Sequence, residues 1–294
     1  MTILLDGKQY SKELKEKIKI ILSEQAYDDM PVLGILQVGN LEESNIYIKY
    51  KLKMASELGF KTEFIKLQEN ADEKTIKDEI LKLNKITDGF IIQLPMQSNQ
   101  IKDPQALLNL IDPLKDIDGL NEKNHFKNSN ESHYLSATPN GIILLLNKYK
   151  IKLKNKSIAV LGQSKIVGYP LANYLENLDN TIYRYTKNTS KNNLDKCEIV
   201  IVATGQRNCI LANQIKENAI IVDVGIHRLE NNKIVGDLDF DEFYKKASYI
   251  TPVPGGVGPM TIISLMLNLL KAKALSSSIF NEIIFKKIEN LLNN

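Results

Sequence analysis

The sequence has few cysteines and no long apolar run, and each shortage excludes a class of protein. The only two cysteines, Cys197 and Cys209, lack the spacing of metal ligands and are too few for a disulfide framework. No segment reaches the roughly 18 apolar residues of a membrane span. The N-terminus has an acidic residue at position 6 and no apolar core of signal-peptide length. We therefore expect a cytoplasmic protein with free thiols, no metal site and no membrane partner.

The net charge is also small, at +3, and the lysines are scattered along the chain. This argues against a nucleic-acid partner, which would favour a basic run or patch. Hydrophobic residues make up 43% of the chain and charged residues 25%, which is typical of a soluble globular protein. With 294 residues, the chain can form roughly two domains, each with its own core.

Short β-rich runs alternate with helical patterns, which predicts an α/β protein with parallel sheets. In the first half the expected strands are 32–38, 62–67 and 89–94. A second series begins at residue 157 with "SIAVLG", "TIYRYT", "EIVIVATG", "AIIVDVGI" and "SYITPV". Between them, residues 119–138 are rich in Asp, Asn, Ser and Gly, so we place a boundary there. The expected domains are residues 1–120 and 138–261.

The last part of the chain has two amphipathic helical patterns, which are broken by Ser276–Ser278. We expect residues 262–294 to pack back on the first domain.

One lysine of the stretch "SNIYIKYKLKM" is in an unexpected place. The segment predicts a helix that is capped by Ser44 and closed by Gly59, with Tyr47, Lys51, Met54 and Leu58 on one face. Lys51 then lies inside the apolar stripe, where an ammonium needs partners or a lowered pKa, and lowered-pKa lysines serve in catalysis. The alternative is a lysine at the edge of the core that reaches water.

The second domain contains a glycine turn between a strand and a helix. "AVLG" ends in Gly162, and a helical pattern opens at Gly168. In this context backbone N–H groups and a helix N-terminus can approach a pyrophosphate, although the spacing G-x-S-x-x-x-G differs from G-x-G-x-x-G. The alternative is an ordinary α/β turn. After the next strand come Arg184 and Lys187 and no acidic residue, as an NADP site would require, unless both are merely surface bases.

Other polar or small residues follow the expected strands. Gln93 ends one strand before Pro95, and Asp116 and Asp118 lie in the loop beyond, where either could simply be a turn residue. "ATG" at 203–205 and "DVGI" at 223–226 close two further strands with small residues. The segment "TPVPGGVGPMT" at 251–261 forms a rigid loop and opens a helix after Pro259, and we interpret it as a ligand wall.

These motifs occur together in the order and spacing of one family. They are Y-x-x-x-K at Tyr47 and Lys51, "QLP" at 93–95, "KDIDG" at 115–119, "TPNG" at 138–141, "GQSKIVGYP" at 162–170, "VATG" at 202–205, "VDVGI" at 222–226 and "TPVPGGVGPMT" at 251–261. Over nearly its whole length the chain resembles the bifunctional methylenetetrahydrofolate dehydrogenase/methenyltetrahydrofolate cyclohydrolase family.

The resemblance implies an α/β protein with an N-terminal folate-binding catalytic domain, a Rossmann-like NADP-binding domain and a cleft between them. It also implies that the protein is a homodimer and that it acts in one-carbon metabolism. This enzyme would oxidise 5,10-methylenetetrahydrofolate with NADP and hydrolyse the methenyl product to 10-formyltetrahydrofolate, which feeds purine, methionine and histidine biosynthesis.

The resemblance also assigns residues. Lys51 would be the central catalytic group, Gln93 would hydrogen-bond it, Tyr47 would orient the folate, and Asp118 would hold the pterin ring. Pro254, Gly255 and Gly256 would line the folate pocket. The residues that would meet the nucleotide are Gly162, Gln163, Ser164, Ile166, Lys187, Ala203, Gly205 and Ile226.

The chain departs from the family pattern near the nucleotide. The family often has an arginine where this chain has Gln163, and "CHS" where it has residues 185–187, so NADP and NAD both stay open as cofactors. We interpret Lys187, with or without Arg184, as the substitute positive charge. Outside this site, the family's "CTP" is Ala-Thr-Pro at 137–139, and "VGNLEES" replaces its usual "VGDNPAS". Neither change removes a named catalytic group.

Three alternatives remain beside the bifunctional enzyme. A chain with only the cyclohydrolase could follow from the missing arginine at position 163. A non-catalytic folate- or nucleotide-binding protein would have no need of Lys51. A dehydrogenase for an unrelated small acid would need a His or Arg in the right loops, whereas His125, His133 and His227 lie outside the catalytic set.

Overall fold

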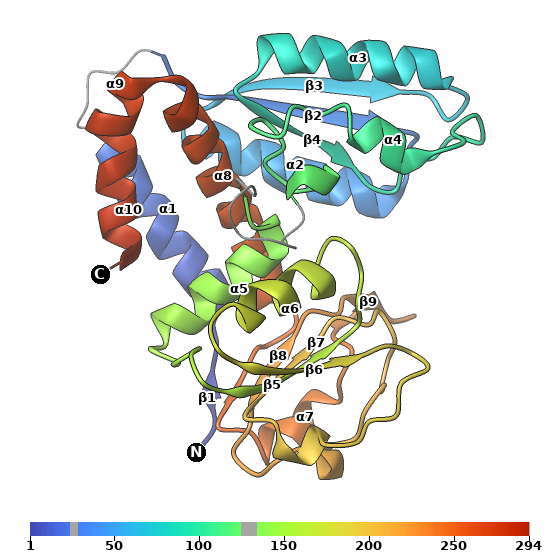
Figure 1. Cartoon of the computed structure of the whole chain (residues 1–294), viewed down its shortest axis with the longest axis vertical. Helices are drawn as coiled ribbons and strands as arrows, with labels where there is room; N and C mark the ends of the chain where they lie inside the picture. The colour runs from blue at the N-terminus through green and yellow to red at the C-terminus, as the bar shows by residue number, and fades with distance from the viewer. Residues whose placement is uncertain (24–28, 125–133, 294) are drawn as a thin grey trace. The chain divides into compact units, whose positions relative to one another are not determined.

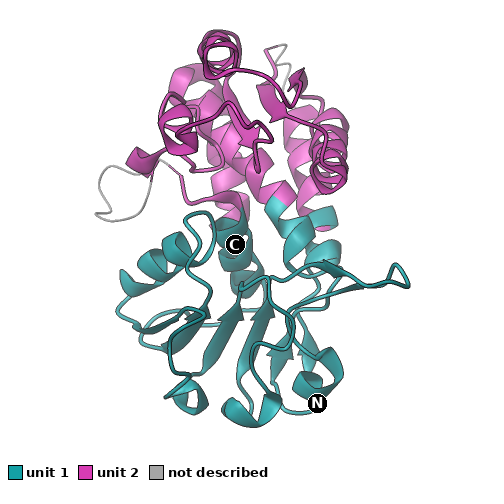
Figure 2. Cartoon of the chain, turned by 90° about the vertical axis from the view of Figure 1, so that its right-hand side faces the viewer, with its two compact units in different colours: residues 1–12, 138–261 teal, residues 13–137, 262–294 magenta. Residues whose placement is uncertain are grey.

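The computed structural model describes residues 1–23, 29–124 and 134–293. The chain forms two compact units (Figure 2). Unit 1 comprises residues 1–12 and 138–261, and unit 2 comprises residues 13–137 and 262–294. His125 and His133 lie outside the described residues. The two cysteines, Cys197 and Cys209, are free thiols, as expected.

Unit 1 is built on a six-stranded sheet in the order β1-β11-β8-β7-β5-β6, and every neighbouring pair is parallel (Figure 1). The strands are β1 (Ile3–Leu4), β5 (Ser157–Leu161), β6 (Thr181–Tyr185), β7 (Ile199–Val202), β8 (Ile220–Asp223) and β11 (Tyr249–Ile250). The central strand β7 is buried along its whole length. A parallel sheet covered on both faces requires such continuous apolar strands, and this is why the sequence pattern predicted them well.

The remaining elements of unit 1 include one helix of 12 residues and several shorter segments. They are α5 (Ala137–Lys148, with Ala137 in unit 2), α6 (Gly168–Glu176), α7 (Phe240–Tyr244), the antiparallel pair β9 (His227–Arg228) and β10 (Ile234–Val235), and the 3₁₀ turns η2 (Leu194–Lys196) and η3 (Ala212–Gln214). The helix α6 contacts β5 and β6, and α7 contacts β11.

Residues 1–12 lie in unit 1, whereas the sequence analysis placed them in the other domain. The reason is that β1 adds an edge strand to this sheet, where Ile3 pairs with Tyr249 and Leu4 with Ile250. A two-residue strand is too short for a pattern of its own to indicate its partner.

Unit 2 contains a three-stranded parallel sheet in the order β3-β2-β4. Its strands are β2 (Val32–Val38), β3 (Lys61–Leu67) and β4 (Gly89–Gln93), and the helices between them are α2 (Glu42–Glu57) and α3 (Glu73–Ile86). From β2 the chain moves to one neighbour and then crosses to the other, so right-handed crossovers place α2 and α3 on opposite faces (Figure 1). The carboxyl ends of β2 and β4 therefore lie side by side at a switch of direction, where open α/β sheets bind ligands.

The C-terminal segment also belongs to unit 2. Its main helix is α8 (Val257–Ser276, which begins in unit 1). From α8, Asn268 Nδ2 donates to the backbone oxygens of Ile117 at 2.8 Å and Leu135 at 3.1 Å. Lys273 pairs with Asp29 at 2.6 Å and Asp88 at 3.3 Å. The other segments of unit 2 are α1 (Gly7–Ser23, which begins in unit 1), α4 (Pro104–Leu108), η1 (Glu122–Asn124), α9 (Ser278–Phe280), a π-helical turn (Asn281–Phe285) and α10 (Lys286–Asn293).

The predicted helix breaks were partly right. The break at Ser276–Ser278 is confirmed, because α8 ends at Ser276 and Ser277 caps α9 by accepting from the Phe280 N–H at 3.3 Å. The predicted cap at Ser44 is wrong. The helix α2 begins at Glu42 with Leu41 as a cap that makes no side-chain hydrogen bond. Ser44 is instead buried within the first turn.

Two further boundaries can be compared with the sequence. Gly59 has the expected left-handed conformation after α2, with a φ of 78°. The helix α8 starts at Val257 rather than after Pro259, which lies in its first turn, where a proline is tolerated. Within the described ranges no helix is both long and apolar enough to cross a membrane.

Candidate functional site

Lys51 lies on the buried face of α2, with 7% of its surface exposed. The buried residues of this helix are Ser44, Ile48, Lys51 and Ala55, a spacing that places them on one face. Lys51 Nζ donates to Gln93 Oε1 at 3.0 Å. Gln93 ends β4, and its own Nε2 donates to the Leu94 carbonyl at 3.0 Å, which fixes the amide so that its oxygen faces the lysine. The expectation that Lys51 is kept from water is confirmed.

Two opposing effects act on the pKa of Lys51. Burial lowers its pKa, and the carboxylate of Asp118 raises it in part, leaving the pKa below that of a free lysine. Burial likewise raises the pKa of Asp118, while Lys51 and a hydrogen bond from the Ala137 backbone oppose that rise. A desolvated lysine beside an acidic group is a common arrangement for proton transfer near neutral pH.

Asp116 shapes the loop that carries Asp118. It is fully buried, and its carboxylate accepts from the backbone of Leu120 at 3.0 Å and Asn121 at 2.8 Å, and from Asn124 Nδ2 at 2.9 Å. Burial raises the pKa of Asp116 to about 6, against the lowering effect of these donors. The two aspartates of "KDIDG" therefore have different roles, since Asp116 holds the turn and leaves Asp118 beside Lys51.

Tyr47 and Gln37 complete the polar surroundings of this end of the sheet. Tyr47 is half-buried on α2, and burial raises the pKa of its hydroxyl. Gln37 is the register partner of Gln93 at the carboxyl end of β2 and is 2% exposed. Its Nε2 donates to Asn45 Oδ1 at 2.8 Å. Gln37 was not predicted, although a lone polar residue at the end of an apolar strand is a signal that could have revealed it.

In unit 1, the turn after β5 has the shape of a nucleotide cradle. Gly162 has a φ of 91°, and a Cβ placed there would meet the Ala203 carbonyl oxygen at 2.1 Å. A Cβ on Gly168, at the start of α6, would meet the Gly162 oxygen at 1.9 Å. Both positions require glycine for close backbone approach, which is the role of glycines in dinucleotide-binding turns.

The other predicted nucleotide residues lie at the carboxyl ends of neighbouring strands. Ala203 and Gly205 follow β7, and Ile226 follows β8 with 48% of its surface exposed. Ser164 is exposed in the turn after β5, and Ile166 is 41% exposed there. Because β8, β7, β5 and β6 are consecutive parallel strands of the sheet, these residues all lie at its carboxyl end. Open α/β sheets bind ligands at this end.

Three polar side chains near this turn differ in whether they are already bonded within the protein. Gln163 folds back, and its Nε2 donates to the carbonyls of Val160 and Gly162, both at 3.0 Å. Arg184 is held by α6, where it contacts Glu176 at 2.7 Å and Asn173 at 2.9 Å. Lys187 is exposed in the loop after β6. Lys187 is therefore the more accessible of the two cations.

The loop of Pro254, Gly255 and Gly256 lies in unit 1, between β11 and α8. Gly255 has a φ of 113°, and its carbonyl accepts from the Lys8 N–H at 2.7 Å. A Cβ on Gly7 would meet the Gly256 oxygen at 1.9 Å. The N-terminal segment thus fixes the backbone of this loop. Tyr47, Lys51, Gln93 and Asp118, in contrast, all belong to unit 2.

A second group that the sequence analysis missed lies in unit 1. It consists of two buried carboxylates, Asp223 and Asp237, and His227, which the sequence analysis placed outside the catalytic set. Among the residues that the structure describes, no cluster of three His, Cys, Asp or Glu side chains could hold a metal ion. The group forms a hydrogen-bond network, in which His227 Nε2 lies 2.7 Å from Asp237 Oδ1.

A parallel sheet with a glycine cradle after β5, and a separate α/β unit with a desolvated lysine, are features of nucleotide-dependent α/β enzymes. Comparison with protein families makes the class specific. Residues 5–118 match the catalytic domain of tetrahydrofolate dehydrogenase/cyclohydrolase, and residues 136–277 match its NAD(P)-binding domain. The chain belongs to the tetrahydrofolate dehydrogenase/cyclohydrolase family.

Individual relatives agree with this assignment. The bifunctional protein FolD of Metamycoplasma arthritidis is 49% identical over 280 residues, which cover 94% of each chain. The crystal structure of the FolD methylenetetrahydrofolate dehydrogenase/cyclohydrolase from Campylobacter jejuni is 36% identical, with a TM-score of 0.86, and the match covers 94% of this chain and 100% of that one. The Trypanosoma brucei enzyme, solved with NADP and an inhibitor, is 28% identical with a TM-score of 0.86, over 94% and 98% of the two chains.

Proposed function

We propose that this protein oxidises 5,10-methylenetetrahydrofolate to the methenyl compound with NADP and then hydrolyses that compound to 10-formyltetrahydrofolate. The observation that carries this proposal is the buried ammonium of Lys51, hydrogen-bonded to Gln93 at 3.0 Å and beside the carboxyl group of Asp118. A binding protein has no use for a desolvated lysine, which costs folding free energy. A catalyst that must deliver or remove a proton, in contrast, can use such a lysine.

The hydrolysis requires a group that can both donate and accept a proton near the reacting carbon. Water adds to the methenyl carbon, and one carbon–nitrogen bond breaks as the formyl C=O forms. Of the two protons that water loses, one is released to solvent and the other is transferred to the nitrogen that leaves. Lys51 Nζ is the group we assign to donate to the developing oxyanion and to move this proton. The Gln93 oxygen aims the amine, and we assign Tyr47 to orient the folate and Asp118 to hold its pterin ring.

The residues of unit 1 fit an NADP molecule. When bound, NADP accepts the hydride that leaves the methylene carbon. Gly162 and Gly168 leave room for backbone approach that any Cβ would fill. Ser164 and Ile166 lie in that turn, and Ala203, Gly205 and Ile226 follow the strands β7 and β8 at the same end of the sheet. We keep Pro254, Gly255 and Gly256 as proposed substrate-binding residues, since their loop presents backbone without long side chains.

Two assays of the wild-type protein test the proposal and separate its alternatives. Methenyl absorbance should appear from methylenetetrahydrofolate only when NADP or NAD is added, and methenyl substrate should be consumed without nucleotide. Consumption alone would indicate a cyclohydrolase, and binding without either reaction would indicate a non-catalytic folate or nucleotide binder. Running the first assay with NADP and NAD in parallel settles the cofactor.

The pH dependence of the hydrolysis should follow the pKa of Lys51. The Asp118 carboxylate raises that pKa, so Asp118→Asn should lower it further. If the protonated amine is the active form, the alkaline limb of kcat then moves to lower pH. Gln93→Glu adds a negative charge beside the amine and should move the limb to higher pH. A pH profile of nucleotide-free methenyl hydrolysis measures both shifts.

The matched control for this experiment is Asp78→Asn, which removes an exposed carboxylate from α3. Its profile should match the wild type. Limbs that stay in place in both Asp118→Asn and Gln93→Glu would mean that Lys51 is not the titrating group.

Lys187 should set the preference for NADP. We expect Lys187→Ala to raise the NADP KM about 5- to 20-fold, since a charged hydrogen bond contributes about 1–2 kcal/mol, and to leave the NAD KM unchanged. The control is Lys216→Ala, an exposed lysine that precedes β8 and so lies at the opposite end of the strands. An NADP/NAD ratio equal to that of the wild type would show that another group reads the phosphate.

We also propose that the protein is a cytoplasmic homodimer. The supporting feature is β3, which lies at the edge of its sheet and is exposed along most of its length, with Phe64 42% exposed. An exposed edge strand with an apolar side chain favours pairing with a second chain. Sedimentation of the purified protein tests the dimer directly.

A further inference from the structure

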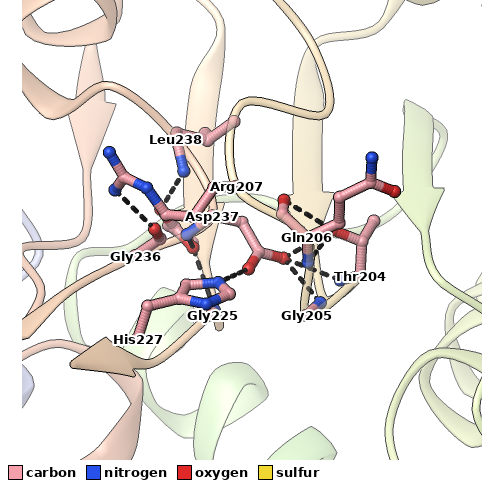
Figure 3. Close-up of polar contacts among 10 residues, drawn as sticks. Thr204, Gly205, Gln206, Arg207, Gly225, His227, Gly236, Asp237 and Leu238 are labelled. Carbon is pink, nitrogen blue, oxygen red and sulfur yellow. Dashed lines mark hydrogen bonds and ion pairs between the residues drawn. The ribbon is translucent and has the colours of Figure 1, made fainter. Parts of the chain in front are cut away.

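Asp237 is a fully buried carboxylate that joins two loops of unit 1 (Figure 3). Its Oδ2 accepts three hydrogen bonds from the loop after β7: from Thr204 N at 2.8 Å, Thr204 Oγ1 at 2.7 Å and Gly205 N at 3.0 Å. Its Oδ1 lies 2.7 Å from Nε2 of His227, in the segment after β8. One side chain therefore holds the carboxyl-end loops of two adjacent strands.

A second carboxylate fixes the position of Asp237 itself. Asp223, at the end of β8, is 5% exposed. Its Oδ1 accepts from the backbone N–H groups of Gly225 and Asp237, and its Oδ2 from that of Leu238, all at 2.9 Å. Burial raises the pKa of Asp223 to about 6, while these donors lower it. Asp237 thus has little freedom to move away from the loops that it joins.

Two glycines allow the backbone to approach the two carboxylates closely. A Cβ on Gly225 would meet Asp237 Oδ1 at 2.1 Å, and a Cβ on Gly236 would meet Asp223 Oδ2 at 2.0 Å. Arg207 Nη1 donates to the Gly236 carbonyl at 2.9 Å and closes the outer side of the network (Figure 3). These contacts make the geometry of the network well defined.

We propose that Asp237 is a positioning residue for the nucleotide and that His227 extends its effect to the loop after β8. The inference rests on the proposed function, which assigns Ala203, Gly205 and Ile226 to nucleotide binding. Ala203 and Gly205 flank Thr204, which Asp237 holds, and Ile226 precedes His227. Asp237 would touch neither substrate nor cofactor, but would set the spacing of the two loops that do.

The network also limits which groups of the loop after β7 can contact a nucleotide. Asp237 accepts from the N–H groups of Thr204 and Gly205, so these donors are directed away from a phosphate. The loop then presents small side chains and backbone surface, which suits contact with a ribose or a ring. The correct position of this surface matters more than its charge.

The first test uses Asp237→Ala and the conservative Asp237→Asn. We expect Asp237→Ala to raise the Kd of NADP, measured by calorimetry, about 10-fold or more, because misplaced binding groups are costly. Its nucleotide-free amide exchange should accelerate at residues 204–206, and its cyclohydrolase kcat should stay within about 2-fold. Asp237→Asn should lie close to the wild type, since its oxygen still accepts from Thr204 and Gly205.

The second test uses His227 and remains available if Asp237→Ala fails to fold. His227→Leu removes the donor to Asp237 at a side chain that is 21% exposed, and we expect about a 3- to 5-fold rise in the NADP Kd. His227→Gln places an amide donor near the same point and should restore the wild-type Kd. The control Asp241→Asn, on an exposed residue of α7, should change nothing.

The outcomes are separable. An unchanged NADP Kd in folded Asp237→Ala, or in His227→Leu, would overturn the inference while the proposed function stands. Equal losses of NADP binding and cyclohydrolase activity would indicate a purely structural network and would also overturn it. A wild-type protein that neither binds nor reduces NADP would overturn the proposed dehydrogenase and this inference together.

Discussion

Replacing Lys51 by methionine should reduce methenyl hydrolysis by about 10²- to 10⁴-fold, the range expected for loss of a positioned proton donor and acceptor. The protein should remain folded, because methionine has a similar length and does not carry the desolvation cost of the buried ammonium. Circular dichroism and the melting temperature of Lys51→Met report on the fold, and the decay of methenyl absorbance without nucleotide reports on the reaction.

The same helix supplies the control for this experiment. Lys49 is exposed on α2, two residues from Lys51, so Lys49→Met removes an equal charge outside the site. Its hydrolysis rate should equal that of the wild type. A Lys51→Met protein that is folded and retains more than about a tenth of wild-type activity would remove Lys51 from the mechanism.

The second large effect is expected at Gly162, where alanine should raise the NADP Kd about 100-fold and lower dehydrogenase activity to match. The added Cβ would lie 2.1 Å from the Ala203 oxygen, and a φ of 91° is strained for any side chain, so the turn must shift. A displacement of about 1 Å in a binding site can cost about 100-fold. Calorimetry with NADP and the NADP-dependent appearance of methenyl absorbance measure the change.

Nucleotide-free hydrolysis by Gly162→Ala should stay near the wild-type rate, because Lys51 and Gln93 belong to the other unit. Lys152→Ala is the control, since this exposed residue precedes β5 and so lies at the opposite end of the strand from the turn. Tight NADP binding by Gly162→Ala would mean that the nucleotide does not use this turn.

Much of the fold could be predicted because its strands are continuous apolar runs. The strand 32–38 was predicted with the bounds that the structure has, and β3 and β4 differ by one residue at one end. The buried position of Lys51 could be predicted as well, since a period of 3.6 residues is a strong local signal. Local pattern, however, gave only the face of the helix. Gln93 and Asp118 are distant in sequence, and their place beside Lys51 came from the family motifs.

The predictions that failed depend on contacts between distant segments. Serine is a favoured residue type for a helix cap, but α2 starts two residues before Ser44 and buries it. The partner of β1 lies near the other end of the chain, and no periodicity could reveal it. Asp237 resembles any turn aspartate in "VGDLDF", and only the folded chain brings it to Thr204, Gly205 and His227.

The pairing of β1 with β11 affects how the protein can fold during synthesis. Ile3 leaves the ribosome long before its neighbour Tyr249, which is translated much later. Each unit is also assembled from two separate stretches of the chain. Neither unit can therefore be completed early in translation, and the nascent N-terminal strand must remain unpaired until its neighbour has emerged.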